Sequence, residues 1–191
     1  LHIISRDTVN QSRLPLERRT SVHTMLASGW AALNEYQRAV EELERAAYLS
    51  PKSDSIKVDL AAYHAILGNE TSARAILEDA IAINATNYLA HSNLGALLAK
   101  SGQLKSAIQH YHDALLFNPT NSDTRHNLGI ALLRSGKSTE AIAEFEKVLK
   151  SKPDFVPSLQ QMTWVLATYP ECQNPERAQL YSKRLMSFPP T

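Results

Sequence analysis

The chain has 191 residues, of which 43% are hydrophobic and 20% are charged, and its formal net charge is +1. This composition is typical of a folded globular protein and excludes disordered and collagen-like chains. No apolar run reaches the roughly 18 residues of a membrane-spanning helix. The near-neutral charge argues against nucleic acid as the main partner. The single cysteine, Cys172, excludes an intramolecular disulfide and a cysteine-rich metal site.

Residues 1–19 stand apart from the rest of the chain, which repeats with a period of 34 residues. One period before the first repeat, its signature positions would hold Ser5, Val9, Ser12 and Glu17, which is a poor match. We interpret this segment as a linker or as a lead that shields the first repeat, with a flexible tail as the alternative. Because the chain starts with Leu1 rather than Met, we expect a processed chain or a piece of a longer protein.

Five repeats follow between Thr20 and Pro190. Similar residues recur 34 positions apart, as in Leu94/Leu128, Gly95/Gly129, Gly102/Gly136, Ala107/Ala141, Tyr111/Phe145 and Pro119/Pro153. The predicted units are 20–53, 54–87, 88–121, 122–155 and 156–190. The last unit slips by three residues within "TYPECQNPER" and resumes its register at Ala178. Such a period predicts a stack of small, similar supersecondary units.

Each unit has the pattern of a helical hairpin. Apolar residues fall at helical spacing in both halves, as at Leu94 and Leu98 and again at Leu104 and Ile108. Between the halves lies a residue that readily takes the left-handed conformation that ends a helix. These residues are Asn34, Gly68, Gly102 and Gly136. Small residues at the eighth and twentieth positions let the two helices approach closely, so we predict an all-α fold.

These residues, at this period, resemble the tetratricopeptide repeat (TPR) family. The best-matching units carry Leu94, Gly95, Ala107, Tyr111, Ala114 and Pro119, and then Leu128, Gly129, Ala141, Phe145 and Pro153. The family's aromatic residue at the fourth position is absent, and His23, Lys57, His91, Arg125 and Leu159 stand there. The resemblance implies a right-handed α-α superhelix, a solenoid of about five hairpins. The last unit is similar to the closing unit of some bacterial TPR arrays.

The resemblance also implies a concave groove lined by the first helix of each unit. The sixth position of these helices holds Met25, Asp59, Asn93, Asn127 and Gln161. The last three are side-chain amides, which can donate to and accept from the backbone of an extended peptide. The column resembles the peptide-holding asparagine ladder of the O-linked N-acetylglucosamine transferase family. The alternative is that these amides bond only to neighbouring loops or to water.

Four further residues are candidates for the same groove. Lys100 and Arg134 lie two turns beyond the amides of their helices and could pair with an acidic side chain or a chain terminus. The alternative for these two is a solvated cation that the helix dipole favours. His126 would add a titratable donor, and Trp164 would add an apolar anchor beside the last amide.

The sequence contains no recognisable catalytic or metal-binding constellation. His110 and His112 are two residues apart, so on a helix they point away from each other, unlike the i, i+4 pair of a zinc site. The glycines are isolated, which excludes a phosphate-binding loop, and Cys172 has no His nearby in sequence to activate it. We therefore predict a protein that is not an enzyme and that uses no cofactor and no metal.

The second helix of the first unit carries a mixed-charge face. Its charged residues are Arg38, Glu41, Glu42, Glu44 and Arg45. Because this pattern is typical of a solvated helix surface, we expect these side chains to face water.

Two functions from different classes fit these features. The first is a non-catalytic scaffold that binds a protein or peptide segment in its groove, without nucleic acid and without membrane insertion. The second is an accessory domain of a larger enzyme or membrane-associated protein. Self-association is compatible with both, through the apolar edge formed by Leu180, Tyr181, Leu185 and Phe188. The sequence does not indicate a compartment.

Overall fold

The computed structural model describes residues 15–187. Within this range there are ten α-helices, one 3-10 helix and no strand, which confirms the all-α prediction. The α-helices are α2 (Leu16–Ala32), α3 (Tyr36–Leu49), α4 (Asp54–Ile66), α5 (Glu70–Ile83), α6 (Tyr88–Lys100), α7 (Leu104–Phe117), α8 (Ser122–Arg134), α9 (Ser138–Ser151), α10 (Val156–Thr168) and α11 (Pro175–Met186). None of these helices is both long enough and apolar enough to cross a membrane.

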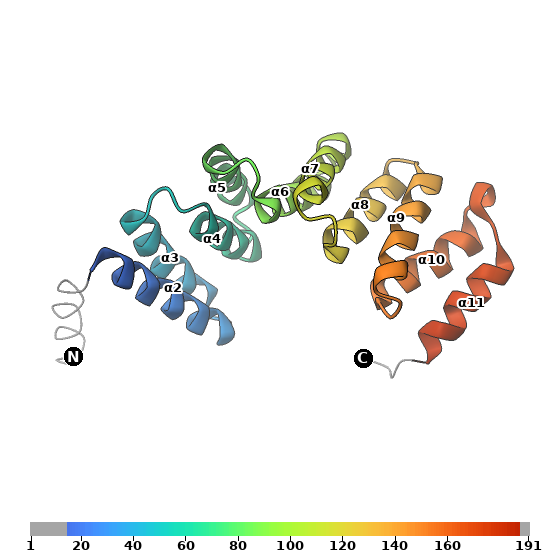
Figure 1. The fold of residues 1–191 in the computed structure, drawn as a ribbon, viewed down its shortest axis with the longest axis horizontal. Helices are drawn as coiled ribbons and strands as arrows, with labels where there is room; N and C mark the ends of the chain where they lie inside the picture. The colour runs from blue at the N-terminus through green and yellow to red at the C-terminus, as the bar shows by residue number, and fades with distance from the viewer. Residues whose placement is uncertain (1–14, 188–191) are drawn as a thin grey trace. The chain divides into compact units, whose positions relative to one another are not determined.

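Two compact units make up the chain, one ending at Asn93 and the other beginning at Leu94, within α6. In the first unit, α2 packs against α3, α3 against α4, and α4 against α5 (Figure 1). In the second unit, α7 packs against α8, and the same consecutive pairing continues through α9 and α10 to α11 (Figure 1). Neighbours in sequence are therefore neighbours in space, as the repeat predicts.

The turn between the two helices of a hairpin depends on one residue with a positive φ. Asn34 has φ 61°, and Gly68, Gly102 and Gly136 have φ between 79° and 82°. Glycine populates this left-handed region without strain, and asparagine tolerates it better than most residues do. The predicted helix-ending role of these four residues is confirmed.

The last hairpin turns differently because Pro170 stands where the other units have Gly or Asn. A short 3-10 helix, Pro170–Cys172, follows α10, and the Asn174 backbone N–H bonds to the carbonyl of Leu166 at 2.9 Å. The Asn174 side chain then caps α11 by accepting a hydrogen bond from the backbone N–H of Arg177. The three-residue slip in register is absorbed by this longer turn, and Ala178 returns to the buried position of the twentieth residue.

Small residues form the contact between the helices of each hairpin. At the eighth and twentieth positions, Ala27, Ala39, Ala61, Ala73, Ala107 and Ala141 are buried. Where the eighth residue is glycine, a ring from the second helix fills the space of the missing side chain. A Cβ on Gly95 would lie 2.8 Å from the Tyr111 ring, and one on Gly129 would lie 2.5 Å from the Phe145 ring. Such distances are too short for non-bonded carbon atoms, so only glycine fits there.

The first helix is longer than its counterparts. α2 begins at Leu16, one turn before the predicted start of the first unit at Thr20, so the end of the predicted lead is helical. Residues 1–14, which hold the rest of that lead, and Phe188 of the predicted apolar edge lie outside the described residues.

Candidate functional site

Two of the three predicted amides lie on neighbouring first helices of the second unit. Asn127 on α8 and Gln161 on α10 are both half-buried. The two helices meet where His126 Nδ1 lies 2.9 Å from Ser158 Oγ, and Gln161 follows Ser158 by one helical turn. Neither amide has a hydrogen-bond partner within residues 15–187, so both are able to bond to a ligand.

The third amide, Asn93, lies on α6 and is also half-buried. Its counterparts earlier in the chain, Met25 on α2 and Asp59 on α4, are exposed. The column thus changes along the chain from an apolar and an acidic side chain to three amides. Asn93 is the last residue of the first unit, whereas Asn127 and Gln161 lie in the second.

His126 is a structural link between α8 and α10. Its ring packs against Phe145 and Phe155, with centroid distances of 5.4 Å and 5.6 Å, and its Nδ1 bonds to the fully buried Ser158 hydroxyl. Burial lowers the pKa of His126 although the Asp123 carboxylate opposes this shift, so the ring is neutral at pH 7. The sequence identified this residue but not the aromatic contacts that hold it.

Lys100 and Arg134 occupy the last turns of α6 and α8, and both are exposed. A cation in this place is stabilised by the helix dipole without any ligand. Arg134 also acts on the neighbouring hairpin, because its positive charge partly offsets the burial that raises the pKa of Tyr111 to about 12. Both cations therefore have a role within the fold as well as access to solvent.

Trp164 lies one turn beyond Gln161 on α10 and is 50% exposed. The Trp164 and Tyr169 rings meet edge to face at a centroid distance of 5.3 Å, which fixes the indole at the end of the helix. An exposed, held aromatic ring beside an unpaired amide offers an apolar contact next to a polar one.

The sequence analysis missed a repeated polar contact at the fourth position of the first helices. His23 Nδ1 lies 2.6 Å from Glu42 Oε2, Lys57 Nζ lies 2.7 Å from Asp79 Oδ2, and Arg125 Nη1 donates to Glu144 Oε2 at 2.7 Å. Each pair joins the two helices of one hairpin. The signal was present in the sequence as an acidic residue at the twenty-third or twenty-sixth position, opposite the basic residue that replaces the family's aromatic one.

These pairs correct the prediction that Glu42 faces water. Glu42 is buried and is paired with His23 and Arg45. Its counterpart Glu144 is equally buried. Desolvation alone would raise the pKa of Glu144, but the hydrogen bonds from Lys147 and Arg125 outweigh desolvation, so the pKa is lowered. The acidic residues at this position are therefore part of the hairpin interior.

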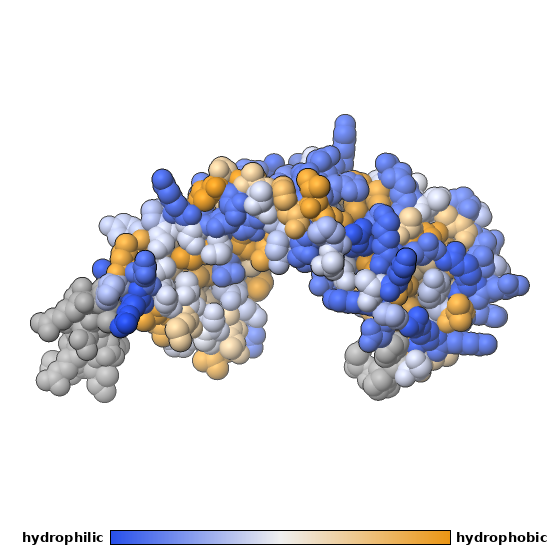
Figure 2. Space-filling view, in the orientation of Figure 1, coloured by the Kyte–Doolittle hydropathy of each residue, from blue (hydrophilic) through white to orange (hydrophobic). Residues whose placement is uncertain are grey.

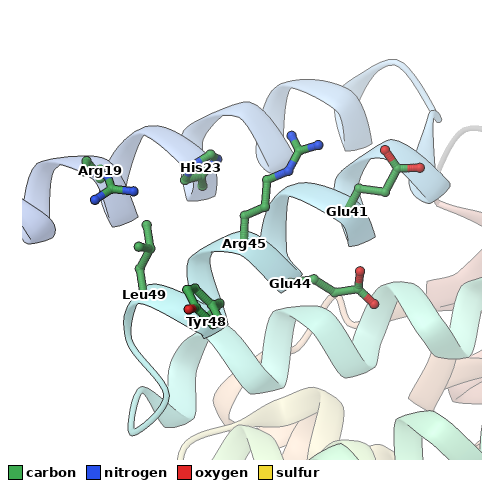
Figure 3. A pocket seen from close by; sticks show the side chains of 7 residues that line it. All are labelled: Arg19, His23, Glu41, Glu44, Arg45, Tyr48 and Leu49. Carbon is green, nitrogen blue, oxygen red and sulfur yellow. The ribbon is translucent and has the colours of Figure 1, made fainter. Parts of the chain in front are cut away.

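A surface hollow of about 560 Å³ lies between the outer sides of α2 and α3 (Figure 3). Its lining residues are Arg19, His23, Glu41, Glu44, Arg45, Tyr48 and Leu49. Arg45 extends from α3 toward α2 in Figure 3 and bonds to Glu42. Because acidic and basic side chains line the same space, the hollow has no preference for a ligand of one charge.

Comparison with known proteins agrees with the fold of helical hairpins. A family model described as "Tetratricopeptide repeat" matches residues 98–163, which run from the end of α6 into α10. The helices before this range repeat the same hairpin with Asn34 and Gly68 at the turns, and α10 and α11 form a further hairpin with a longer turn. Residues 98–163 thus match the tetratricopeptide repeat (TPR) family, and the described helices have the fold of TPR proteins. No curated protein matches the chain significantly.

Solved structures share the fold of this protein at low sequence identity. PilF of Pseudomonas aeruginosa matches with a TM-score of 0.83 and 20% identity, covering 92% of this chain and 79% of that one. MamA from Desulfovibrio magneticus RS-1 matches with a TM-score of 0.76 and 15% identity, covering 88% and 93%. YrrB, described as a TPR protein with an unusual peptide-binding site, matches with a TM-score of 0.68 and 21% identity, covering 86% and 84%. At these identities the likeness establishes the fold.

Proposed function

We propose that this protein is a non-catalytic TPR scaffold that binds an extended segment of a protein partner along the first helices of its later hairpins. The observation that carries the proposal is the pair of amides, Asn127 and Gln161, which are half-buried and have no hydrogen-bond partner in residues 15–187. A carboxamide that folding leaves unpaired offers both a donor and an acceptor to a peptide backbone.

The surroundings of the amides suit a peptide rather than a small reactive substrate. His126, beside Asn127, is held between two phenylalanine rings and supports the scaffold. Trp164 offers an exposed aromatic contact, while Lys100 and Arg134 offer cations to acidic side chains of the peptide. YrrB, which shares the fold, is described by its peptide-binding site, and this likeness supports the same class of ligand here.

The test starts from peptides selected against the full-length chain from a random displayed library, whose affinities are then measured by titration calorimetry. Replacing Asn127 and Gln161 together by Ala is expected to weaken binding by about tenfold or more, as befits the loss of two to four hydrogen bonds. Gln160→Ala is the matched control, since Gln160 is an exposed amide on the same helix that points elsewhere.

Circular dichroism and urea unfolding of each variant separate loss of binding from loss of fold. Equal affinities for the wild type, the amide variants and the Gln160→Ala control would contradict the proposed peptide site.

A further inference from the structure

One side of α2 carries an apolar stripe of six residues: Val22, Met25, Leu26, Gly29, Trp30 and Leu33. Each of them lies three or four residues from another member of the stripe, so they share one side of the helix, and they line a shallow hollow of about 510 Å³. Met25 is 72% exposed and Leu33 is 67% exposed. Figure 2 shows orange, hydrophobic patches among paler atoms on the surface of the first hairpin, at the left of the view.

In other hairpins, the residues equivalent to Leu26 are covered by a neighbouring helix. Leu26 is 41% exposed, whereas its counterparts Leu60, Leu128 and Met162 are buried. α4, α8 and α10, which carry those counterparts, each receive the second helix of the preceding hairpin, α3, α7 or α9. Within the described residues no helix covers the stripe of α2. Among residues 15–187, the stripe is therefore a helix-docking face that no helix occupies.

Gly29 adds an independent observation. Glycine is unfavourable in the interior of a helix, and no atom lies within 4 Å of the place where its Cβ would be. The tenth position holds Tyr63, Ala131 and Val165 in other hairpins. No contact in the described chain accounts for this glycine. It leaves a hole in the stripe, walled by Leu26 and Trp30, that a large apolar side chain can enter.

We propose that α2 pairs with α2 of a second copy of this chain in an antiparallel, two-fold symmetric dimer. In this pairing Leu26 enters the hole over Gly29 of the second copy, and the symmetric contact repeats it. The outer pairs are Val22 with Leu33 of the second copy, and Met25 with Trp30 of the second copy. The residue numbers of each pair add up to 55, so one antiparallel register uses every residue of the stripe.

Self-complementarity is the property that a two-fold interface requires, because the same patch must serve both partners. The stripe meets this requirement, because its six residues pair with one another in a single register and none of them is charged. The Arg38 guanidinium of α3 lies 4.7 Å from the centroid of the Trp30 ring, at the edge of the stripe. A single helix pair buries less area than a standard stable interface, so the dimer is expected to be weak and to depend on concentration.

Sedimentation equilibrium of the full chain over a range of concentrations is the first test. The mass is expected to rise from 21.2 kDa toward twice this value as the concentration rises. Leu26→Glu is expected to abolish the rise, whereas Leu116→Glu, at a more exposed leucine on α7, is expected to leave it unchanged. A mass that stays monomeric at the highest soluble concentration, or a dimer that survives Leu26→Glu, would overturn the proposal.

Gly29→Gln gives two opposite readouts in one variant. Glutamine favours a helix interior over glycine and has open space around it, so the melting temperature of the dilute chain is expected to rise by about 2 °C. The same side chain fills the hole, so the dimer is expected to be lost. A dimer that persists in this variant contradicts the packing of Leu26 over Gly29 of the second copy.

Disulfide cross-linking tests the register. In a Cys172→Ser background, Val22→Cys and Leu33→Cys chains are oxidised separately and as a mixture. The antiparallel pairing predicts a cross-linked dimer only in the mixture, because two Val22 positions would be about 16 Å apart along the helix axis. Cross-links in the separate samples, or none in the mixture, would contradict the pairing; the latter result is expected if another segment or protein covers the stripe.

Discussion

The hairpins of the two units fill the space between their two helices with different residue pairs. In the first unit, the eighth position is Ala27 or Ala61, and the bulky residue opposite at the twenty-fourth position is Leu43 or Leu77. In the second unit, glycine at the eighth position is matched by an aromatic ring, Tyr111 over Gly95 and Phe145 over Gly129. The residues at the eighth and twenty-fourth positions fill the space between the helices together. The size that fits at one position therefore depends on the residue at the other.

The largest expected effect comes from breaking this match. Gly129→Ala places a methyl group against the fully buried Phe145 ring and is expected to lower the free energy of unfolding by about 2–3 kcal/mol. Adding Phe145→Leu restores the pair used in the first unit and is expected to recover most of the loss. Urea unfolding of the single and double variants measures both. Additive losses would show that the two positions do not share the same space.

The polar pair at the fourth position gives the next effect. Arg125→Leu removes one of the two cations that bond to the buried Glu144, and is expected to cost about 2 kcal/mol at pH 7. The pKa of Glu144 is lowered in the folded state, so this contribution is present above its ordinary pKa of 4.5 and is lost as the pH falls through and below that value.

Chemical denaturation of the wild type and Arg125→Leu at several pH values measures this difference. Arg74→Ala is the control, because Arg74 and its partner Glu78 are both exposed and their pair is expected to contribute at most about 0.5 kcal/mol. If the difference in unfolding free energy between the wild type and Arg125→Leu stays constant down to acid pH, the role given to the ionised Glu144 is contradicted.

The second unit is expected to respond to mild acid through His126. The pKa of His126 is lowered by burial below its ordinary value of 6.5, so the unfolded chain binds this proton more readily than the folded chain. Stability of the second unit is therefore expected to fall as the pH drops below about 6.5. His126→Gln is expected to flatten this part of the pH profile, whereas substituting the exposed His112 by Gln is not. Identical profiles for both variants would contradict the burial of the neutral ring.

The smallest expected effect concerns the hairpin turns. The first hairpin uses Asn34 at φ 61°, while the fourth uses Gly136 at φ 79°. Asn34→Gly is expected to stabilise the chain by a few tenths of a kcal/mol, and Gly136→Asn to destabilise it by a similar amount, because glycine takes the left-handed conformation with less strain. Thermal unfolding of the two variants shows whether each substitution raises or lowers the stability. Two shifts of the same sign would show that side-chain contacts, such as the hydrogen bond from the Tyr36 hydroxyl to the Asn34 side chain, outweigh backbone strain.

The candidate site was only partly visible in the sequence. The positions of Asn127 and Gln161 on first helices follow from the repeat, because residues 34 apart occupy equivalent places in successive hairpins. That both side chains lack partners, and that His126 instead bonds to Ser158, depends on which atoms the next hairpin brings close. The same cause explains Glu42, whose charge predicts exposure until His23 and Arg45 are seen to surround it.

The sequence by itself determined the helical hairpins, their period and the turn residues between them. These features depend on short-range properties, namely apolar spacing and the backbone conformations open to glycine, asparagine and proline. Only the tertiary structure decided which members of a repeat column are buried and which are exposed, as with Leu128 and Leu26. Burial depends on whether another helix covers the residue. The identity of the residue does not reveal this, because the covering helix is in place only when the hairpins are stacked.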